Sequence, residues 1–455
     1  MNITGNTNKP LNYPGSVHCH TDFSNLRLRD CIIKTEDLIW YAAELGHRIV
    51  GITEHEALSN HILAGKVYRK VKEKYPDFKM VRGNEIYLCR DGLDANNFNK
   101  ENDRYWHFIL IAKDKIGHEQ IRKISTRAWA RSYISRGMRR VPTYYQDLID
   151  IIGEEPGHVI GSTACLGGVL PGQLLKYREN QNQELFDKIL LWIEQMREIF
   201  GKDNFFLELQ PSHHKDQKYV NKMLISLSKS CNVPYIITTD AHYLKKEDRP
   251  IHKAFLNAQE GDREVDDFYA TTYLMDTEEI ESFLDLTKEQ LQYAYSNINK
   301  IADMCTDYDL EKPLKIPRLM WKEPNYLVDP SVYYDVIPWL KTFMDSDYDG
   351  DKILCHHIVD RICSDKTLQN EETYKEINSN LKTTWVSSEV NKTHWSAYFL
   401  NLQKIIEECW EAGSIVGCGR GSGVGFMLLY ILGITQINPL RETTRTFEWR
   451  LTRKG

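Results

Sequence analysis

Seven short apolar runs, rich in β-branched and aromatic residues, recur along the first half of the chain. Stretches with apolar residues at helical spacing separate several of them, for example Thr35–Leu45, Leu58–Lys74 and Asn182–Phe200. Strands that alternate with helices are typical of a parallel sheet or a barrel. The pattern therefore predicts an α/β domain with these strands: Ser16–His20, Arg48–His55, Lys79–Glu85, Trp106–Ala112, His158–Cys165, Phe205–Pro211 and Val233–His242.

From about residue 286 the pattern becomes mostly helical. The segment Thr287–Asp307 reads as a helix, and the proline-bearing segment Leu310–Pro317 reads as a linker. Apolar spacings of three and four predict helical structure over Trp339–Glu376 and an amphipathic helix over Tyr398–Glu411. We expect a first domain over residues 1–285 and a second over 286–455.

Composition narrows the class of protein. Of the 455 residues 42% are hydrophobic and 27% charged, which is ordinary for a soluble globular protein of two or three domains. No apolar run approaches the roughly 20 residues that span a bilayer, and the polar start does not resemble a signal peptide. Ten cysteines without a CxxC pair argue against a disulfide framework and a zinc ribbon, so we expect a reducing cytoplasm.

The net charge of −6 is unusual for a nucleic-acid-binding protein, but it does not exclude one. Positive charge can be local, and bound divalent metals invert the sign of a site. Basic residues cluster in Arg127–Arg140 and in Arg441–Lys454. For the first cluster, a solvated helix face is an equally good interpretation.

Metal-type side chains stand at or near the ends of the predicted strands. In a β/α barrel, catalytic residues gather at the carboxyl ends of the strands. Mixed nitrogen, oxygen and sulfur ligands favour Zn²⁺, Mn²⁺ or Fe²⁺ over Mg²⁺ and Ca²⁺, and the number of ligands suffices for up to three ions. Ions about 3.5–4 Å apart can hold a phosphodiester and activate water, which indicates a metal-dependent phosphoesterase. The nine candidate ligands are His18, His20, Asp30, His55, Glu85, His107, Cys165, Asp240 and His242.

Four motifs around these ligands resemble those of the PHP (polymerase and histidinol phosphatase) domain: His18–Thr21, Thr53–His55, Gly83–Tyr87 and Thr239–Tyr243. More narrowly, they are similar to the PHP domain that begins the alpha subunit of bacterial DNA polymerase III, a C-family replicase. The segments His107–Ala112 and Ser162–Gly168 fall where the family's fourth and fifth strand motifs would lie. The resemblance implies a distorted seven-stranded β/α barrel that holds Zn²⁺ or Mn²⁺. It also implies 3′–5′ exonuclease or pyrophosphatase activity, with a purely structural metal site as the alternative.

Asp30 is assigned by this resemblance, although the preceding segment Asp22–Arg29 is longer than the family's usual spacing and Asp22 is a rival.

The remaining histidines are interpreted as less relevant to the site. His213 and His214 follow the sixth run, so an approach to the same face is one interpretation, but we expect them in a solvated loop. We expect His356 and His357 on helices. Surface or helix-capping positions are expected for His47, His61, His118 and His158.

The second strong motif is the glycine-rich stretch Gly417–Gly425. Clustered glycines let backbone N–H groups approach phosphate oxygens, and Arg420 adds a bidentate donor. By itself the motif fits a tight turn before a buried helix, Val424–Leu432, equally well. The run Gly417–Leu440, however, resembles the palm signature of C-family polymerases, a polymerase-β-like palm whose loop contacts the incoming triphosphate. The candidate phosphate-binding residues are Gly419, Arg420, Gly421, Ser422 and Gly425.

Two departures from the family bear on this assignment. The family has Gly-Ser where this chain has Gly425-Phe426, which removes a hydroxyl from the loop. The family's paired aspartates, which bind the catalytic Mg²⁺ ions, follow a segment similar to Phe447–Leu451, and the chain stops at Gly455 before any such pair. Because two-metal phosphoryl transfer needs those carboxylates, we expect this polypeptide alone not to polymerise. The break point and the altered loop suggest a split or truncated, phage-encoded polymerase.

The leading hypothesis is a role in DNA replication, with DNA and dNTPs as ligands. The expected partners are the C-terminal half of the polymerase as a separate chain, the sliding clamp and other replisome proteins. One rival is a free-standing PHP phosphoesterase that acts on a small phosphate ester or a nucleic-acid end. The other is a non-catalytic scaffold that holds replisome partners.

Overall fold

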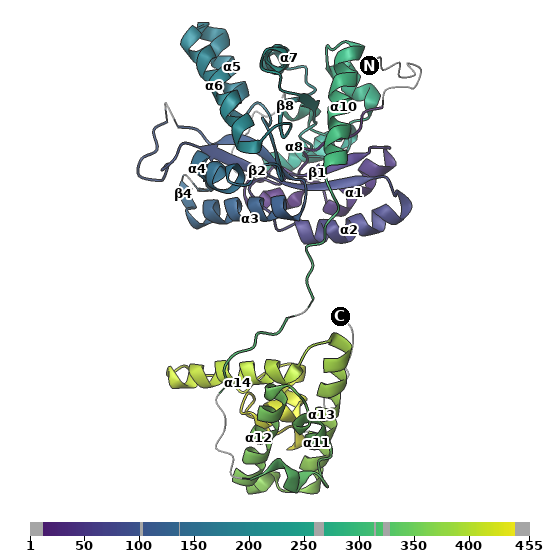
Figure 1. Cartoon of the computed structure of the whole chain (residues 1–455), viewed down its shortest axis with the longest axis vertical. Helices are drawn as coiled ribbons and strands as arrows, with labels where there is room; N and C mark the ends of the chain where they lie inside the picture. Colours follow the sequence, from purple (N-terminus) through teal and green to yellow (C-terminus); the bar gives the residue numbers. More distant parts are fainter. Residues whose placement is uncertain are drawn as a thin grey trace. The chain divides into compact units, whose positions relative to one another are not determined.

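The computed structural model describes residues 12–100, 103–135, 137–258, 268–313, 315–321 and 328–441. The chain forms two compact units, Met1–Glu311 and Lys312–Gly455 (Figure 1). The first unit extends past the boundary predicted at residue 285, because helix α10 (Lys288–Met304) packs against strands β1 (Ile49–Ile52) and β9 (Tyr235–Ile237). The apolar face of α10 completes the core of the first unit.

A mixed seven-stranded sheet lies at the centre of the first unit, and the predicted α/β class is confirmed. The strand order is β1-β2-β3-β7-β8-β9, with β6 beside β2. Strand β3 runs antiparallel to both of its neighbours, whereas the other pairs are parallel, so the sheet is not the all-parallel one that the alternating pattern indicates. The remaining bounds are β2 (Lys79–Cys89), β3 (Trp106–Ala112), β6 (Pro142–Tyr144), β7 (Val159–Ser162) and β8 (Phe205–Leu209).

Residues 16–20, predicted as the first strand, are not a regular strand but connect the two edges of the sheet. The Gly51 N–H donates to the Ser16 carbonyl oxygen at 2.9 Å, and the His20 N–H donates to that of Ala241 at 2.9 Å. This segment thus lies between β1 and the chain that follows β9, and we call it the closing segment. Gly51 permits the approach, since a Cβ there would lie 2.0 Å from the Val17 carbonyl oxygen.

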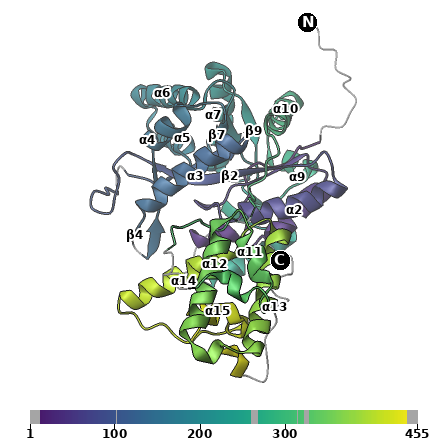
Figure 2. The ribbon, with the colours of Figure 1, turned by 60° about the horizontal axis from the view of Figure 1, so that its bottom comes forward.

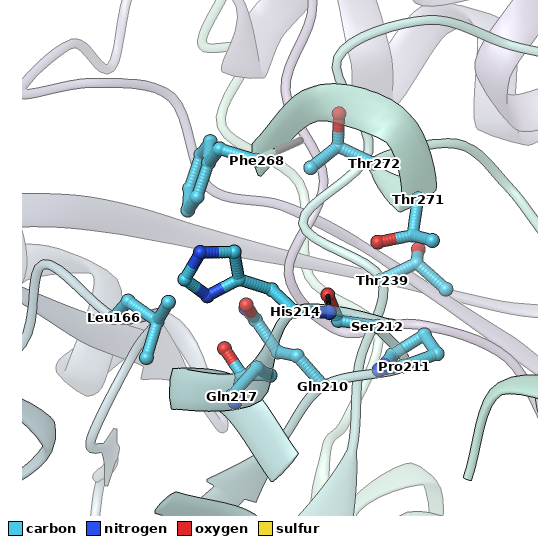
Figure 3. Close-up of a pocket in the computed structure, with 10 residues that line it drawn as sticks. All are labelled: Leu166, Gln210, Pro211, Ser212, His214, Gln217, Thr239, Phe268, Thr271 and Thr272. Atoms are coloured by element: carbon cyan, nitrogen blue, oxygen red, sulfur yellow. Dashed lines mark hydrogen bonds between the residues drawn. The ribbon is translucent and has the colours of Figure 1, made fainter. Parts of the chain in front are cut away.

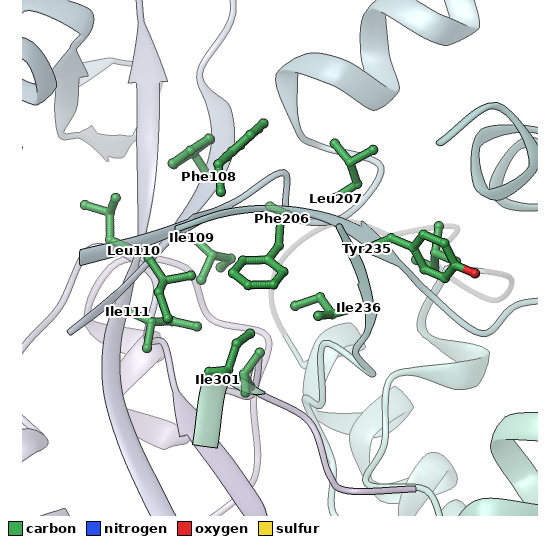
Figure 4. Packing of buried hydrophobic residues seen from close by; sticks show 14 of the residues in the cluster. Phe108, Ile109, Leu110, Ile111, Phe206, Leu207, Tyr235, Ile236 and Ile301 are labelled. Carbon is green, nitrogen blue, oxygen red and sulfur yellow. The ribbon is translucent and has the colours of Figure 1, made fainter. Parts of the chain in front are cut away.

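The strands of the sheet are apolar on both faces because helices and loops cover both of them. Phe108, Ile109, Leu110 and Ile111 of β3 are all fully buried, and they pack with residues of β8 and β9 (Figure 4). Helix α3 (Lys115–Ala130) contacts β2, β3, β6 and β7. The other elements of this unit are α1 (Thr35–Glu44), α2 (His61–Lys74), the hairpin strands β4 (Tyr133–Ser135) and β5 (Met138–Arg140), α4 (Tyr145–Leu148), α5 (Val169–Asn180), α6 (Gln183–Phe200), α7 (Lys215–Cys231), α8 (Arg249–Asn257) and α9 (Thr277–Phe283).

The regular elements described in the second unit are all helices, as the pattern predicts, and loops such as residues 414–420 connect them (Figure 2). The stretch predicted as helical over 339–376 is divided, because the Asn370 side chain caps a new helix by accepting from the Thr373 N–H. The helix expected over 424–432 is preceded by a short 3₁₀ turn. The helices are α11 (Trp339–Met344), α12 (Asp349–Ser364), α13 (Glu371–Asn391), α14 (Trp395–Glu411) and α15 (Met427–Ile431). In the part of the chain that is described, every helix is too short or too polar to cross a membrane.

Candidate metal centre

The fold brings all nine predicted ligands together at one end of the sheet. The closing segment carries His18 and His20, and the chain just beyond β9 carries Asp240 and His242. Glu85 lies inside β2 rather than at its end, because β2 continues in order to pair with β6. The ligand-type atoms form three groups, in each of which the atoms lie within 4.8 Å of one another. These groups are His20, His55 and His242; His18, His20 and Asp240; and Glu85, His107 and Cys165.

One of these groups presents acceptor atoms that face each other. The Nδ1 of His18 lies 2.6 Å from Glu208 Oε1, and the Nδ1 of His20 lies 2.9 Å from the Ser24 hydroxyl oxygen, which itself donates to Glu54. If each Nδ1 carries the proton, the two Nε2 lone pairs face each other at 3.2 Å. Asp240 Oδ1 lies 3.0 and 3.1 Å from the same two atoms. Three acceptors around one point fit a cation.

Asp30 lies in the same cluster, on the side of His55 and His242. Its Oδ2 is 3.3 Å from His55 Nε2 and 3.5 Å from His242 Nε2, and the Tyr269 hydroxyl donates to it at 3.1 Å. The rival Asp22 instead pairs with the exposed Lys34. Asp30 Oδ1 is buried without a hydrogen-bond partner, and on the other side of His55 the Nδ1 atom contacts Glu85 Oε2. A buried acceptor without a partner fits a metal ligand.

The protonation of these side chains, considered with the protein groups alone, follows from burial and from the neighbouring charges. Burial lowers the pKa of His18, but Asp240 and Glu208 more than offset this and raise it well above its ordinary value. Burial, together with His55 and His242, lowers the pKa of His20 to about 3. For His55, Asp30 and Glu85 overcome the effect of burial and raise the pKa to about 10. The nearby histidines hold the pKa of Glu85 and of Asp240 well below its usual range despite burial, so both stay ionised.

Sequence reasoning missed the residues that orient the ligands. Glu208 in β8 is buried and accepts from the Ser162 and Thr238 hydroxyls, besides its contact with His18. Glu54 likewise accepts from Thr21 and Ser24. The sequence did contain a signal for Glu208, which is a carboxylate in the otherwise apolar run Phe205–Leu209. Because a carboxylate is rarely buried without partners, its position indicates a polar contact inside the fold.

Three of the histidines expected at the surface or at helix caps are in fact buried, namely His47, His61 and His118. Each finds a partner inside the fold: His47 Nε2 lies 3.1 Å from the Met275 carbonyl oxygen, and His61 lies 3.0 Å from His118. His158 is half-buried and pairs with Asp114.

A small pocket, most of whose lining residues have polar side chains, adjoins the centre where β7, β8 and β9 end (Figure 3). His214, expected in a solvated loop, lines this pocket together with Gln210 and Gln217. Phe268 and Leu166 lie beside the His214 ring. Thr239 also lines the pocket, and its buried hydroxyl has no hydrogen-bond partner.

The glycine-rich loop lies in the second unit and is exposed from Gly417 to Gly421. Gly419 and Gly421 have φ angles of +101° and +76°, a region that favours glycine. No ion pair of Arg420 occurs within the described ranges. The basic cluster 441–454, apart from Arg441, and the segment 447–451 lie outside the described residues.

Two known protein families match the chain, one over most of the candidate metal ligands and one over the glycine-rich loop. The PHP domain matches residues 16–212, and the bacterial DNA polymerase III alpha NTPase domain matches residues 354–454. The chain is thus similar to the PHP domain in its first part and to the bacterial DNA polymerase III alpha NTPase domain in its last part.

Relatives extend this relationship over nearly the whole chain. The "Probable DNA polymerase YorL" of Bacillus subtilis strain 168 and the "DNA-directed DNA polymerase" of Bacillus phage SPbeta are each 36% identical to it over 453 residues. The DNA polymerase III subunit alpha of Aquifex aeolicus is 29% identical over 456 residues. These alignments cover 93–94% of this chain but only 34% of each relative, so the chain spans about a third of their length.

Proposed function

We propose that this polypeptide acts in DNA replication as the N-terminal part of a polymerase III alpha subunit, and that its PHP centre hydrolyses phosphodiester bonds at the 3′ end of DNA. The observation that carries the proposal is the convergence of nine ligand-type side chains, eight of them buried, at one end of the sheet. The acceptor atoms of His18, His20 and Asp240 face one another, which supports a cation there.

The three groups described above would hold up to three Zn²⁺ or Mn²⁺ ions. When bound, such ions supply Lewis acidity and a nucleophilic water at neutral pH. The chain's own residues keep the ligands in place: Glu208 fixes the orientation of the His18 ring, and Ser24 fixes that of His20. Partial exposure of His107, at 21% of its side chain, supports an approach of substrate from that side.

The test uses the full chain loaded with Zn²⁺ or Mn²⁺ and a 5′-labelled single-stranded oligonucleotide. We expect stepwise shortening from the 3′ end, and a loss of at least 100-fold in His20→Ala. His394→Ala, a half-exposed histidine of the second unit, is the matched control and should retain activity. Bound metal without hydrolysis would instead support a structural site, and hydrolysis of pyrophosphate alone would support a pyrophosphatase.

We also propose that the glycine-rich loop contacts the triphosphate of a dNTP. The positive φ angles of Gly419 and Gly421, together with the exposed Arg420 between them, support a phosphate-binding loop. Titration with a fluorescent dNTP should show at least tenfold weaker binding in Arg420→Ala. Equal binding by parent and variant would contradict this role.

A further inference from the structure

A second cavity, of about 290 Å³, opens beside the metal centre on the side of His107. Three arginines and three aromatic residues line it: Arg27, Arg104, Arg140, Tyr87, Phe98 and Tyr105. We call it the arginine cavity. His107 belongs both to this cavity and to the ligand group with Glu85 and Cys165, so the cavity borders the centre directly.

Arg27 is the unusual residue of this cavity. Only 7% of it is exposed, yet its Nε and one terminal nitrogen, Nη1, have no hydrogen-bond partner. Its guanidinium carbon lies 4.4 Å from the centroid of the Tyr87 ring, and that ring lies 5.0 Å from the His107 ring. Burying a cation without a paired anion is unfavourable. An anion bound in the cavity would supply the missing acceptors.

The carboxyl group of the nearby buried Glu56 interacts electrostatically with Arg27, but its hydrogen bonds are accepted from the Asn84 side chain and the Tyr87 N–H. Arg104 donates to backbone carbonyl oxygens, and Arg140 lies over the Tyr105 ring at 5.1 Å. The carboxylate in the lining, Asp103, is already paired with Arg90 at 2.6 Å. Within the described ranges, no carboxylate forms an ion pair with any of the three lining arginines. The cavity is therefore cationic.

The aromatic residues add a surface on which a base could stack. Phe98 and Tyr105 lie parallel, with ring centroids 5.7 Å apart and an angle of 10° between their planes. Phe98 remains 37% exposed, so it is available to a ligand. Arginines that bind phosphate, interleaved with aromatic rings that stack on bases, are typical of proteins that bind single-stranded nucleic acid.

We infer that the arginine cavity holds a second phosphate and a base of a single-stranded polynucleotide whose reacting phosphodiester lies in the metal centre. This inference rests on the proposed hydrolytic function and deepens it, because it assigns a binding site to the part of the strand that does not react. A polynucleotide strand occupies both sites, whereas pyrophosphate or a small phosphate ester occupies the metal centre alone.

The first experiment measures binding, so that it does not depend on hydrolysis. Fluorescence anisotropy of a labelled single-stranded 12-mer, made with phosphorothioate linkages that resist hydrolysis, is recorded with the metal-loaded full chain at several salt concentrations. We expect Arg27→Gln to bind about tenfold more weakly, with the slope of log K against log salt reduced by about 0.7, as for one lost contact to a single strand. Arg122→Gln, an exposed arginine of α3, is the matched control.

The second experiment compares two substrates. Arg27→Gln should raise the KM for the 12-mer about tenfold and leave kcat/KM for bis(p-nitrophenyl) phosphate within twofold of the parent. If the parent cleaves neither substrate, the proposed function fails while the binding experiment still tests the cavity. Equal binding and an equal salt slope in parent and Arg27→Gln would overturn the inference.

Because Arg27 is buried, its substitution could unfold the chain, so metal content and Tm are measured for each variant. Phe98→Leu provides a second test at an exposed position. It should weaken binding of the 12-mer about threefold or more, but not binding of an abasic 12-mer of the same length. Equal losses for both strands would contradict the stacking role.

Discussion

The buried pair of His61 and His118 predicts a specific loss of stability in acid. His61 Nε2 lies 3.1 Å from the Gly83 carbonyl oxygen, so it is the donor there, and His61 Nδ1 accepts from His118 Nε2 at 3.0 Å. Burial, with Arg82 and Arg122 nearby, lowers the pKa of His118 to about 4. Burial, His118 and Arg82 also lower the pKa of His61. Both rings are therefore neutral at pH 7.

The sign and size of the effect follow from proton linkage. In the unfolded chain the pKa of His118 is about 6.5, so the unfolded state binds more protons than the folded state between pH 6.5 and pH 4. The free energy of unfolding must fall as the pH falls through this window. The contribution lost from His118 is about 2 kcal/mol at pH 5 and about 3 kcal/mol at pH 4. His61 adds to the loss in the same direction.

The assay is urea unfolding of the parent and of His118→Asn at pH 7, 6, 5 and 4.5. At pH 7 the variant should be less stable by about 1–3 kcal/mol, because His61 Nδ1 loses its donor. The difference should shrink with acidification and reverse near pH 5, since the variant lacks the group that takes up the proton. A difference that stays constant from pH 7 to pH 4.5 would refute the reasoning.

Three further predictions concern the sheet and the centre. Gly51→Ala should lower the free energy of unfolding by about 3 kcal/mol or more and release bound metal, since its Cβ would lie 2.0 Å from the Val17 carbonyl oxygen; calorimetry and metal analysis measure this. Glu208→Gln should weaken Zn²⁺ binding about 10- to 100-fold in competition with a chelator, because it removes the carboxylate beside His18. Phe200→Ala should lower the free energy of unfolding by about 3–5 kcal/mol in denaturant, since the ring is fully buried.

Two of these predictions have a matched control variant, and the third has an outcome that would contradict it. Gly153→Ala should be nearly neutral, because the nearest atom would lie 3.9 Å from its Cβ; a similar result for Gly51→Ala would show that the closing segment tolerates displacement. Glu184→Gln, on an exposed turn of α6, should leave Zn²⁺ affinity unchanged, and an unchanged affinity in Glu208→Gln would show that His18 is oriented without it. For Phe200→Ala, a loss below about 1 kcal/mol would mean that the core closes over the gap.

The nine candidate ligands could be proposed as one set because those residues stand at or next to apolar runs, and apolar runs of this kind predict strands that belong to one sheet. His107 and Glu85 were found in this way, although they lie within strands rather than at strand ends. Strand β6 is only three residues long and offered no recognisable run. The antiparallel direction of β3 depends on its partners in space, which hydrophobic pattern alone does not specify.

The residues that support the centre could not be predicted for a different reason. Glu208 and Arg27 are charged residues that pattern rules assign to the surface, and only tertiary structure shows what surrounds them. The same holds for His61 and His118, whose pKa values are lowered by burial and whose rings form a hydrogen bond with each other. A charged residue within an apolar run thus indicates that a buried charge needs a partner, but the sequence does not show which residue is that partner.

The closing segment cannot reach its native position until late in the synthesis of the protein. Cys19 forms an isolated parallel β-bridge with Ala241, which is synthesised 222 residues later. At about 5–20 residues per second, a ribosome needs roughly 10–45 s to reach that partner. Throughout this time His18 and His20 are present without Asp240 and His242, and the sheet has an open edge. The first histidines to leave the ribosome are therefore among the last to reach their native surroundings, and nascent chains interrupted before Ala241 should bind metal weakly.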